Sequence, residues 1–102
     1  IPQVKFFEEM PWSVSNCWLS TIGVPKEDRT PLLEYLCKQN IQARPVWKLI
    51  HTLPMYATSQ AYAIEHASKI WACAINLPCS VSITQQQLSR VTDAITSFYR
   101  NR

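Results

Sequence analysis

Apolar and polar positions along the chain predict four short strands. The stretch 3–7 is short and partly alternating, as at the edge of a sheet, whereas 15–24 is apolar on both faces, which indicates a central strand. The stretch 41–47 alternates as well, but Pro45 cannot donate to a ladder, so this strand should lie at an edge or end there. A short apolar run at 74–78 predicts a buried strand.

Helical spacing predicts a first helix after a turn at 25–28. Thr30 is a preferred N-cap, and Pro31 falls at the first helical position, where its missing N–H costs nothing. Asn40 is expected to end this helix, because asparagine tolerates the left-handed conformation common at helix ends. The apolar stripe of the helix consists of Leu32, Leu33, Leu36 and Cys37.

Two further helices are predicted after an irregular segment at 48–60. The first covers 60–73, and the second begins at a capping box formed by Thr84 and Gln87 and continues to the end of the chain. The apolar face of the former consists of Ala63, Ile64, Ala67, Ile70 and Trp71. That of the latter consists of Leu88, Val91, Ile95 and Phe98.

The order of these elements predicts an α+β fold: a small, mainly antiparallel sheet with about three helices packed on one face. The chain has 102 residues, of which 47% are hydrophobic and 17% charged. This size and composition are typical of one globular domain, so we expect a single domain over 1–102.

Composition excludes several classes of function. The only glycine is Gly23, so the chain has no glycine-rich loop of the kind that binds nucleotide phosphates. The net charge of +3 is spread along the chain without the basic stripe of nucleic-acid-binding proteins. No apolar run is long enough to span a membrane. Neither nucleic acid nor a membrane is therefore an expected partner.

The cysteines and histidines form neither a disulfide framework nor a metal site. None of the four cysteines has C-x-x-C spacing, and His51 and His66 do not complete a ligand set with them, so we interpret all four as reduced thiols that act mostly as small hydrophobes. No signal peptide is visible, since Glu8 and Glu9 lie in the first ten residues. A cytoplasmic protein is the expectation, and the lack of an initiator Met suggests a trimmed or excised chain.

One stretch, "NIQARPVWKLIHTLPMY" at 40–56, contains the candidate substrate-binding residues Arg44, Trp47, Lys48, His51 and Tyr56. An arginine can bind phosphate or carboxylate through its bidentate fork, a histidine can donate to a substrate oxygen, and aromatic rings can stack on a sugar or a base. Structural roles stay open: a surface arginine, a loop-anchoring histidine and a packed tryptophan. We predict a strand end followed by an exposed loop, with the cationic side chains on one accessible side.

Four motifs, in order, carry a resemblance to a known family. They are "SNCWLSTI", "NIQARPVWKLIH" followed by "LPMY", "AINLPCS", and a final helix that opens "TQQQLSRVTDAI". Together they resemble the C-terminal small domain of the DegT/DnrJ/StrS type of pyridoxal-phosphate-dependent sugar aminotransferase, a fold-type I enzyme. The form "RPVWKLIH" followed by "LPMY" is most similar to the subgroup that makes amino sugars for surface glycans.

The resemblance implies that the catalytic parts lie outside this chain. In that family the Schiff-base lysine, the carboxylate facing the pyridine nitrogen and the phosphate cup belong to the large N-terminal domain. None of the five lysines here has the family's Ser-x-x-His-x-x-Lys context. The resemblance therefore implies no catalytic residue and no cofactor bound by this chain alone, with pyridoxal phosphate as the cofactor of the parent family.

Two functions are compatible with the resemblance. In the first, the chain is the small domain of a nucleotide-sugar aminotransferase, which covers the active site and contributes contacts to a sugar nucleotide. In the alternative, it is a free-standing, non-catalytic binding or oligomerisation module derived from that domain. The expected partner is the large aminotransferase domain or a second copy of the chain, in a homo-oligomer.

Overall fold

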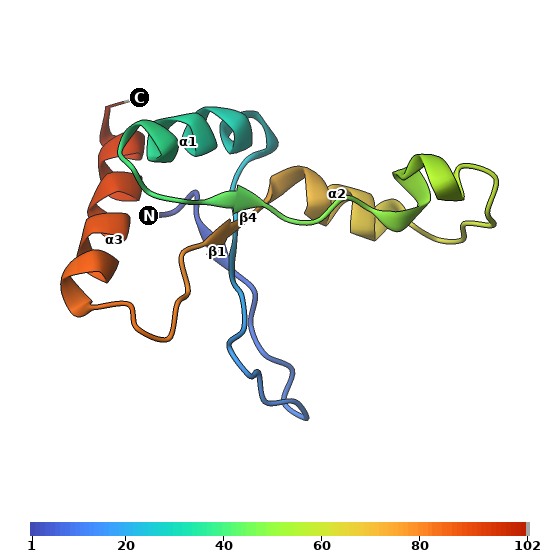
Figure 1. Ribbon diagram of the computed structural model, residues 1–102, viewed down its shortest axis with the longest axis horizontal. Helices are drawn as coiled ribbons and strands as arrows, with labels where there is room; N and C mark the ends of the chain where they lie inside the picture. Colours follow the sequence, from blue (N-terminus) through green and yellow to red (C-terminus); the bar gives the residue numbers. More distant parts are fainter. Residues whose placement is uncertain (102) are drawn as a thin grey trace.

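A four-stranded antiparallel sheet lies at the centre of the computed structural model, which describes residues 1–101 (Figure 1). The strands, in the spatial order β1-β2-β4-β3, are β1 (Lys5–Phe6), β2 (Ser20–Gly23), β3 (Arg44–Pro45) and β4 (Ala74–Leu77). The edge positions predicted for 3–7 and 41–47 and the central position predicted for 15–24 are confirmed. The strands at these three places are shorter than the sequence predicts.

Strand β2 is short because the residues before it use their backbone donors in local turns. The N–H of Cys17 donates to the hydroxyl of Ser15 at 3.0 Å, and the N–H of Trp18 donates to Asn16 Oδ1 at 3.1 Å. Cys17 also has a positive φ of 53°. Such turns compete with a strand ladder for the same donors, so regular pairing with β4 begins at Ser20.

Helix α1 (Lys26–Lys38) begins earlier than the sequence predicts. The turn predicted at 25–28 and the N-cap predicted at Thr30 are both wrong, because Pro25 occupies the N-cap position and Pro31 lies inside the helix. The first turn carries two acidic side chains, which the electropositive start of a helix stabilises. This charge interaction favours the earlier start over the Thr-Pro signal.

The end of α1 confirms the stop predicted at Asn40. Asn40 has a φ of 55°, and its N–H donates to the carbonyl of Cys37 at 2.9 Å. The N–H of Ile41 donates to the carbonyl of Leu36, also at 2.9 Å. This pair of bonds is a Schellman motif, in which a left-handed residue turns the chain back over the helix. The turn places Ile41 in the core.

The core lies between the sheet and the helices α1 and α3 (Gln85–Arg100). Its buried residues are Ile22, Val24, Leu32, Leu36, Ile41, Ile75, Val91 and Ile95. Sheet residues and helix residues therefore share one apolar centre, and the α+β fold class that the element order predicts is confirmed.

Helix α3 begins at the predicted capping box. The N–H of Thr84 donates to Gln87 Oε1 at 2.9 Å, and the N–H of Gln87 donates to Thr84 Oγ1 at 3.2 Å. The predicted apolar stripe is buried at Val91 and half-buried at Phe98, but Leu88 is exposed. The stripe thus reaches the core only from the second turn of the helix onwards.

Helix α2 (Glu65–Cys73) is shorter and more exposed than predicted. Ala63 has a positive φ of 50°, which breaks the predicted helical run, so the helix begins two residues later. Ile70, on the predicted apolar face, is exposed, whereas Trp71 is half-buried. The guanidinium of Arg29 lies 4.7 Å from the Trp71 ring centroid, which connects α2 to α1.

The four cysteines are free, but only two are partly covered. Cys73 donates its thiol to the carbonyl of Ile70 at 3.3 Å, and Cys79 donates to the carbonyl of Trp18 at 3.2 Å. The side chains of Cys17 and Cys37 are exposed. The interpretation of all four as small hydrophobes is therefore wrong for the latter two.

Candidate functional site

Two segments project from the body of the fold as arms (Figure 1). The first arm, residues 7–19, connects β1 to β2. The second arm, residues 47–64, runs between β3 and α2 and contains short 3₁₀ turns at Ile50–Thr52 and Pro54–Tyr56. The segment that the sequence predicts to be irregular forms most of the second arm.

Three of the five candidate residues lie where the second arm leaves the sheet. Arg44 is in the edge strand β3, and its side chain is exposed, as the alternation predicts. Lys48 is exposed as well. Trp47 is 70% exposed, and its ring centroid lies 5.5 Å from that of Trp18, with the rings tilted by 54°. Since Trp18 belongs to the first arm, this aromatic pair joins the two arms.

The other two candidates share a separate hollow further along the second arm. His51 and Tyr56 line a depression of about 420 Å³, with Tyr62 and Ile64 also in its wall. The first three candidates do not line it. The structure thus divides the predicted set into a cationic and aromatic group at the base of the arm and a histidine–tyrosine hollow beyond it.

Two residues beside Arg44 were missed by the sequence analysis. Asn76 of β4 is the direct cross-strand partner of Thr21 in β2 and of Arg44 in β3. The hydroxyl of Thr21 donates to Asn76 Oδ1 at 2.7 Å. The signal in the sequence was a polar residue inside the apolar run 74–78. The side chains that Asn76 contacts depend on the register of three strands. That register is set only when the sheet folds, so the sequence pattern does not reveal the partners of Asn76.

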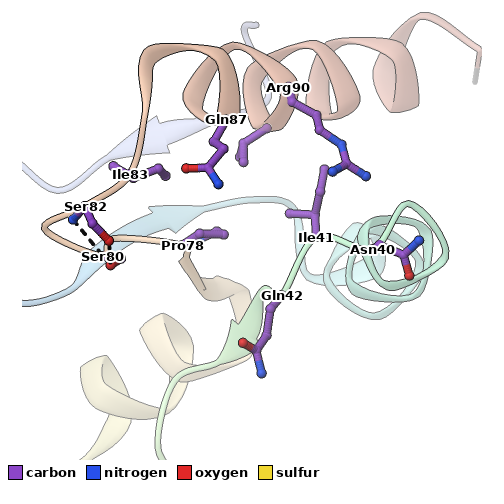
Figure 2. A pocket seen from close by; sticks show the side chains of 10 residues that line it. Asn40, Ile41, Gln42, Pro78, Ser80, Ser82, Ile83, Gln87 and Arg90 are labelled. Atoms are coloured by element: carbon purple, nitrogen blue, oxygen red, sulfur yellow. Dashed lines mark hydrogen bonds between the residues drawn. The ribbon is translucent and has the colours of Figure 1, made fainter.

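Another hollow, of about 330 Å³, lies away from all five candidates, between α3 and the exit of α1 (Figure 2). Figure 2 shows Gln87 and Arg90 on α3 and Asn40 at the end of α1. The guanidinium of Arg90 donates to the carbonyl of Gln39 at 2.5 Å, next to this hollow. Cationic side chains stabilise the C-terminal ends of helices, so this arginine connects α3 to α1.

The lysines do not form the enclosed site that a Schiff base with pyridoxal phosphate requires. Lys5, Lys26, Lys38, Lys48 and Lys69 are all exposed, and none lines the four hollows in the described residues. A cofactor lysine is normally held in a pocket that orients it and tunes its pKa. No lysine in the described residues has such a pocket.

Residues 1–101 contain neither a metal-binding cluster nor a membrane-spanning helix. No three His, Cys, Asp or Glu side chains in this range are grouped so that they can hold a metal ion. None of the helices in the same range is long and apolar enough to cross a membrane. Exposed cationic and aromatic side chains, those of Arg44, Lys48 and Trp47, lie where the second arm leaves β3.

Comparison with known sequences identifies the family of the chain. Residues 1–96 match the model of the DegT/DnrJ/EryC1/StrS aminotransferase family. EpsN of Bacillus subtilis strain 168, named for a pyridoxal-phosphate-dependent aminotransferase, is 29% identical over 104 residues, which cover 94% of this chain and 26% of EpsN. GDP-perosamine synthase of Escherichia coli O157:H7 is 32% identical over 77 residues, which cover 74% of this chain and 21% of that enzyme. The chain spans about a quarter or less of the length of these relatives.

Solved structures have the same fold. The sugar aminotransferase CalS13 from Micromonospora echinospora matches with a TM-score of 0.82 and 18% identity, over 95% of this chain and 26% of its own. AtS13 from Actinomadura melliaura matches with a TM-score of 0.83 and 16% identity, over 95% of this chain and 25% of its own. With the family model matching nearly every residue and the fold agreeing, this chain belongs to the DegT/DnrJ/EryC1/StrS aminotransferase family.

Proposed function

We propose that this chain is the small C-terminal domain of a pyridoxal-phosphate-dependent nucleotide-sugar aminotransferase. In that role it covers the active site and contributes contacts to the substrate, and it does not catalyse the reaction alone. The observation that carries the proposal is the proportion of the match: 94% of this chain aligns with 26% of EpsN. This proportion is explained if the chain is one domain of a larger enzyme, because the match covers nearly all of this chain and only a quarter of EpsN.

The exposed apolar side chains of the two arms support a partner that covers them. Trp12 and Val14 in the first arm are 82% and 95% exposed, and Tyr62 in the second arm is 89% exposed. Large apolar side chains on projecting segments are typical of protein interfaces. We take the large aminotransferase domain as the partner that buries them.

The candidate residues support a phosphate-bearing sugar as the substrate. Arg44 and Lys48 supply positive charge at the base of the second arm, and Trp47 supplies an aromatic face beside it. His51 and Tyr56 supply hydrogen-bonding groups in the next hollow. The name of the relative GDP-perosamine synthase supports a nucleotide-linked sugar as the class. Because this chain forms one wall of such a site, it should bind the sugar only weakly by itself.

A second candidate function rests on the same exposed arms. A free-standing module of this family would have to cover its arms with a second copy of itself, because uncovered apolar surface favours association. Both candidates include a cytoplasmic location, which the four free cysteines support, since thiols stay reduced in that compartment.

The test uses the complete reading frame that contains these 102 residues. The complete protein and the chain alone are each mixed with pyridoxal phosphate and borohydride, and modified lysines are located by mass spectrometry. We expect one stoichiometric phosphopyridoxyl-lysine in the complete protein, outside this chain, and scattered partial labelling of the chain alone. A single stoichiometric lysine within the chain would overturn the proposal.

The same experiment separates the two candidates. A reading frame without a large domain and without a specifically labelled lysine would contradict the aminotransferase function. Sedimentation of the chain as a discrete dimer would then favour the free-standing module.

The labelling experiment has Lys48→Arg as its control variant. This change removes a lysine of the candidate site but keeps its charge, so the specific labelling of the complete protein should stay unchanged.

A further inference from the structure

Three polar residues lie in one row across the sheet, and we call them the polar row: Thr21, Asn76 and Arg44. Asn76 of β4 is paired directly with Thr21 on one side and with Arg44 on the other. Directly opposed residues of antiparallel strands point to the same face, with their Cβ atoms about 4.5–5.5 Å apart. The three side chains therefore stand next to one another on one face.

That face is the one that the core helices leave uncovered. Ile22 and Ile75, the sequence neighbours of Thr21 and Asn76, are fully buried in the core beneath α1 and α3. Successive side chains of a strand point to opposite faces, so the polar row lies on the far side of the sheet from this core. Thr21 and Asn76 are half-buried there, and Arg44 is exposed.

One hydrogen bond within the polar row fixes the Asn76 amide and leaves its N–H donors unused. The hydroxyl of Thr21 donates to Asn76 Oδ1 at 2.7 Å, which orients the amide and leaves its Nδ2 group as a donor. Among the described residues, neither this amide nitrogen nor the Arg44 guanidinium has a hydrogen-bond partner. A half-buried amide donor beside a guanidinium is suited to an oxyanion, which accepts from both.

A hollow next to the polar row can accommodate the body of such a ligand. Thr21 is in the wall of a depression of about 550 Å³, together with Leu19, Val46 and Ile70. Two carboxylates, Glu8 and Glu9, are also in this wall, and Glu9 accepts a hydrogen bond from the N–H of Ser15 at 2.9 Å. The hollow thus offers apolar contact next to Thr21, whereas Asn76 and Arg44, which carry the donors of the row, lie outside its wall.

We propose that the polar row is an oxyanion subsite, in which Asn76 and Arg44 contact the ligand and Thr21 positions the Asn76 amide. The ligand chemistry is a phosphate or carboxylate oxyanion on an uncharged body. This inference rests on the proposed function and deepens it, because it adds Asn76 to the substrate contacts of the same domain and Thr21 as the residue that positions its amide. It makes Asn76 a determinant of substrate binding that the sequence pattern does not reveal.

The first experiment observes the amide directly. The complete protein that contains this chain is labelled with ¹⁵N at asparagine, and inorganic phosphate or, in a separate arm, glutarate is added. The side-chain NH₂ signals of Asn76, assigned by their loss in Asn76→Asp, should shift with saturation in one arm or both, which identifies the oxyanion. Side-chain signals of Asn76 that do not move in either arm would overturn the proposal.

The second experiment measures affinity by calorimetry with whichever of the two anions shifts the signals. Asn76→Asp keeps the acceptor for Thr21 but replaces the donor with a negative charge, so binding should weaken by about tenfold or more. Asn40→Asp is the matched control: the same change at an exposed asparagine outside the row should alter affinity by less than about twofold. An equal effect of the two variants would contradict the proposal.

The positioning role of Thr21 has its own readout. Thr21→Val removes the hydroxyl without changing the shape, so the Asn76 side-chain signals should move even without ligand and affinity should fall several-fold. Thr21→Ser restores the hydroxyl donor and should restore both the signals and the affinity.

Activity of the complete protein separates failure of the subsite from failure of the proposed function. If the complete protein transaminates but Asn76→Asp leaves kcat/KM unchanged, the subsite proposal is wrong while the proposed function stands. If it does not transaminate, the function fails and the anion titration still tests the row.

Discussion

The body of the fold and its two arms contain the same kinds of large apolar residue and treat them in opposite ways. In the body, Ile22, Leu32 and Ile75 are completely buried. In the arms, Val14 and Tyr62 are almost completely exposed. The body buries its central apolar side chains by itself, whereas the most exposed side chains of the arms have no such cover within the chain. Hydrophobic residues in the arms are therefore better explained by binding than by folding.

The two regions also differ in what gives them their conformation. The body is held by burial, by the Schellman turn at Asn40 and by the capping box at Thr84. The arms are held by local turns, such as the bond from the Thr52 hydroxyl to the carbonyl of Leu49 at 2.7 Å. Local hydrogen bonds in water contribute little net free energy, since water competes for the same groups. Stability should accordingly respond strongly to changes in the body and much less to changes in the arms.

The largest effect is expected from truncating a core residue. Ile75→Ala should lower the free energy of unfolding by about 2–5 kcal/mol, because it removes buried methyl groups and leaves a cavity. The matched arm variant Ile50→Ala, at a side chain that is 69% exposed, should change it by less than about 0.5 kcal/mol. Urea denaturation measures both, and equal losses would show that the arms share the stability of the body.

The next effect concerns the polar ends of the body's helices. Thr84→Ala removes the N-cap of α3 and should cost about 0.5–2 kcal/mol. Thr30→Ala makes the same chemical change inside α1, where alanine is the better helix former, and should stabilise by up to about 0.7 kcal/mol. Thermal melts followed by circular dichroism compare the two. A loss at Thr30 would indicate that it caps the helix after all.

The aromatic pair between the arms gives a smaller effect. Trp18 and Trp47 should couple by about 0.5–1.5 kcal/mol in a double-mutant cycle with alanine, measured by urea denaturation. Tryptophan fluorescence should change in each single variant, since each ring lies against the other. A coupling of zero would mean that the pair contributes no stability to the chain alone. The arms would then differ from the body, whose contacts do stabilise it.

The smallest effect, and the one confined to alkaline pH, concerns Tyr99 in the body. Burial, and then the nearby Glu27 carboxylate, raise the pKa of the Tyr99 hydroxyl above its ordinary value. The neutral hydroxyl is thus favoured by folding, and this stability is present below about pH 10 and is lost as the pH rises through the raised value. Tyr99→Phe should be near neutral at pH 7 and should lose less stability above pH 10 than the wild type.

Urea midpoints between pH 7 and 11 test this prediction for Tyr99→Phe against the wild type. The same alkaline loss of stability in both would show that the burial of Tyr99 has no effect on its titration.

Many features of the body could be predicted from the sequence because their causes are local. The Thr84–Gln87 capping box and the stop at Asn40 each involve residues only a few positions apart. The start of α1 was misplaced because two local signals competed, and the acidic first turn outweighed Thr30 followed by Pro31. Helix α2 was predicted too long because nothing in the apolar spacing reveals the left-handed Ala63.

The candidate site could be predicted only in part. Alternation of apolar and polar residues was sufficient to place Arg44 on the exposed side of an edge strand, and this is confirmed. The sequence analysis grouped His51 with Arg44, whereas the fold places it in another hollow. Asn76 and the Trp18–Trp47 pair were missed because their partners are distant in the chain.

The sequence by itself determined the fold class, the family resemblance, the strand and helix order, the capping box at Thr84 and the helix stop at Asn40, because periodicity and turn chemistry act between neighbours. Only the tertiary structure decided which apolar residues became core and which stayed exposed on the arms. It alone brought Thr21 to Asn76, 55 positions apart, within 2.7 Å. The physical reason is that burial and cross-strand pairing depend on the packing of distant segments, and the register that opposes two side chains is set by the whole sheet.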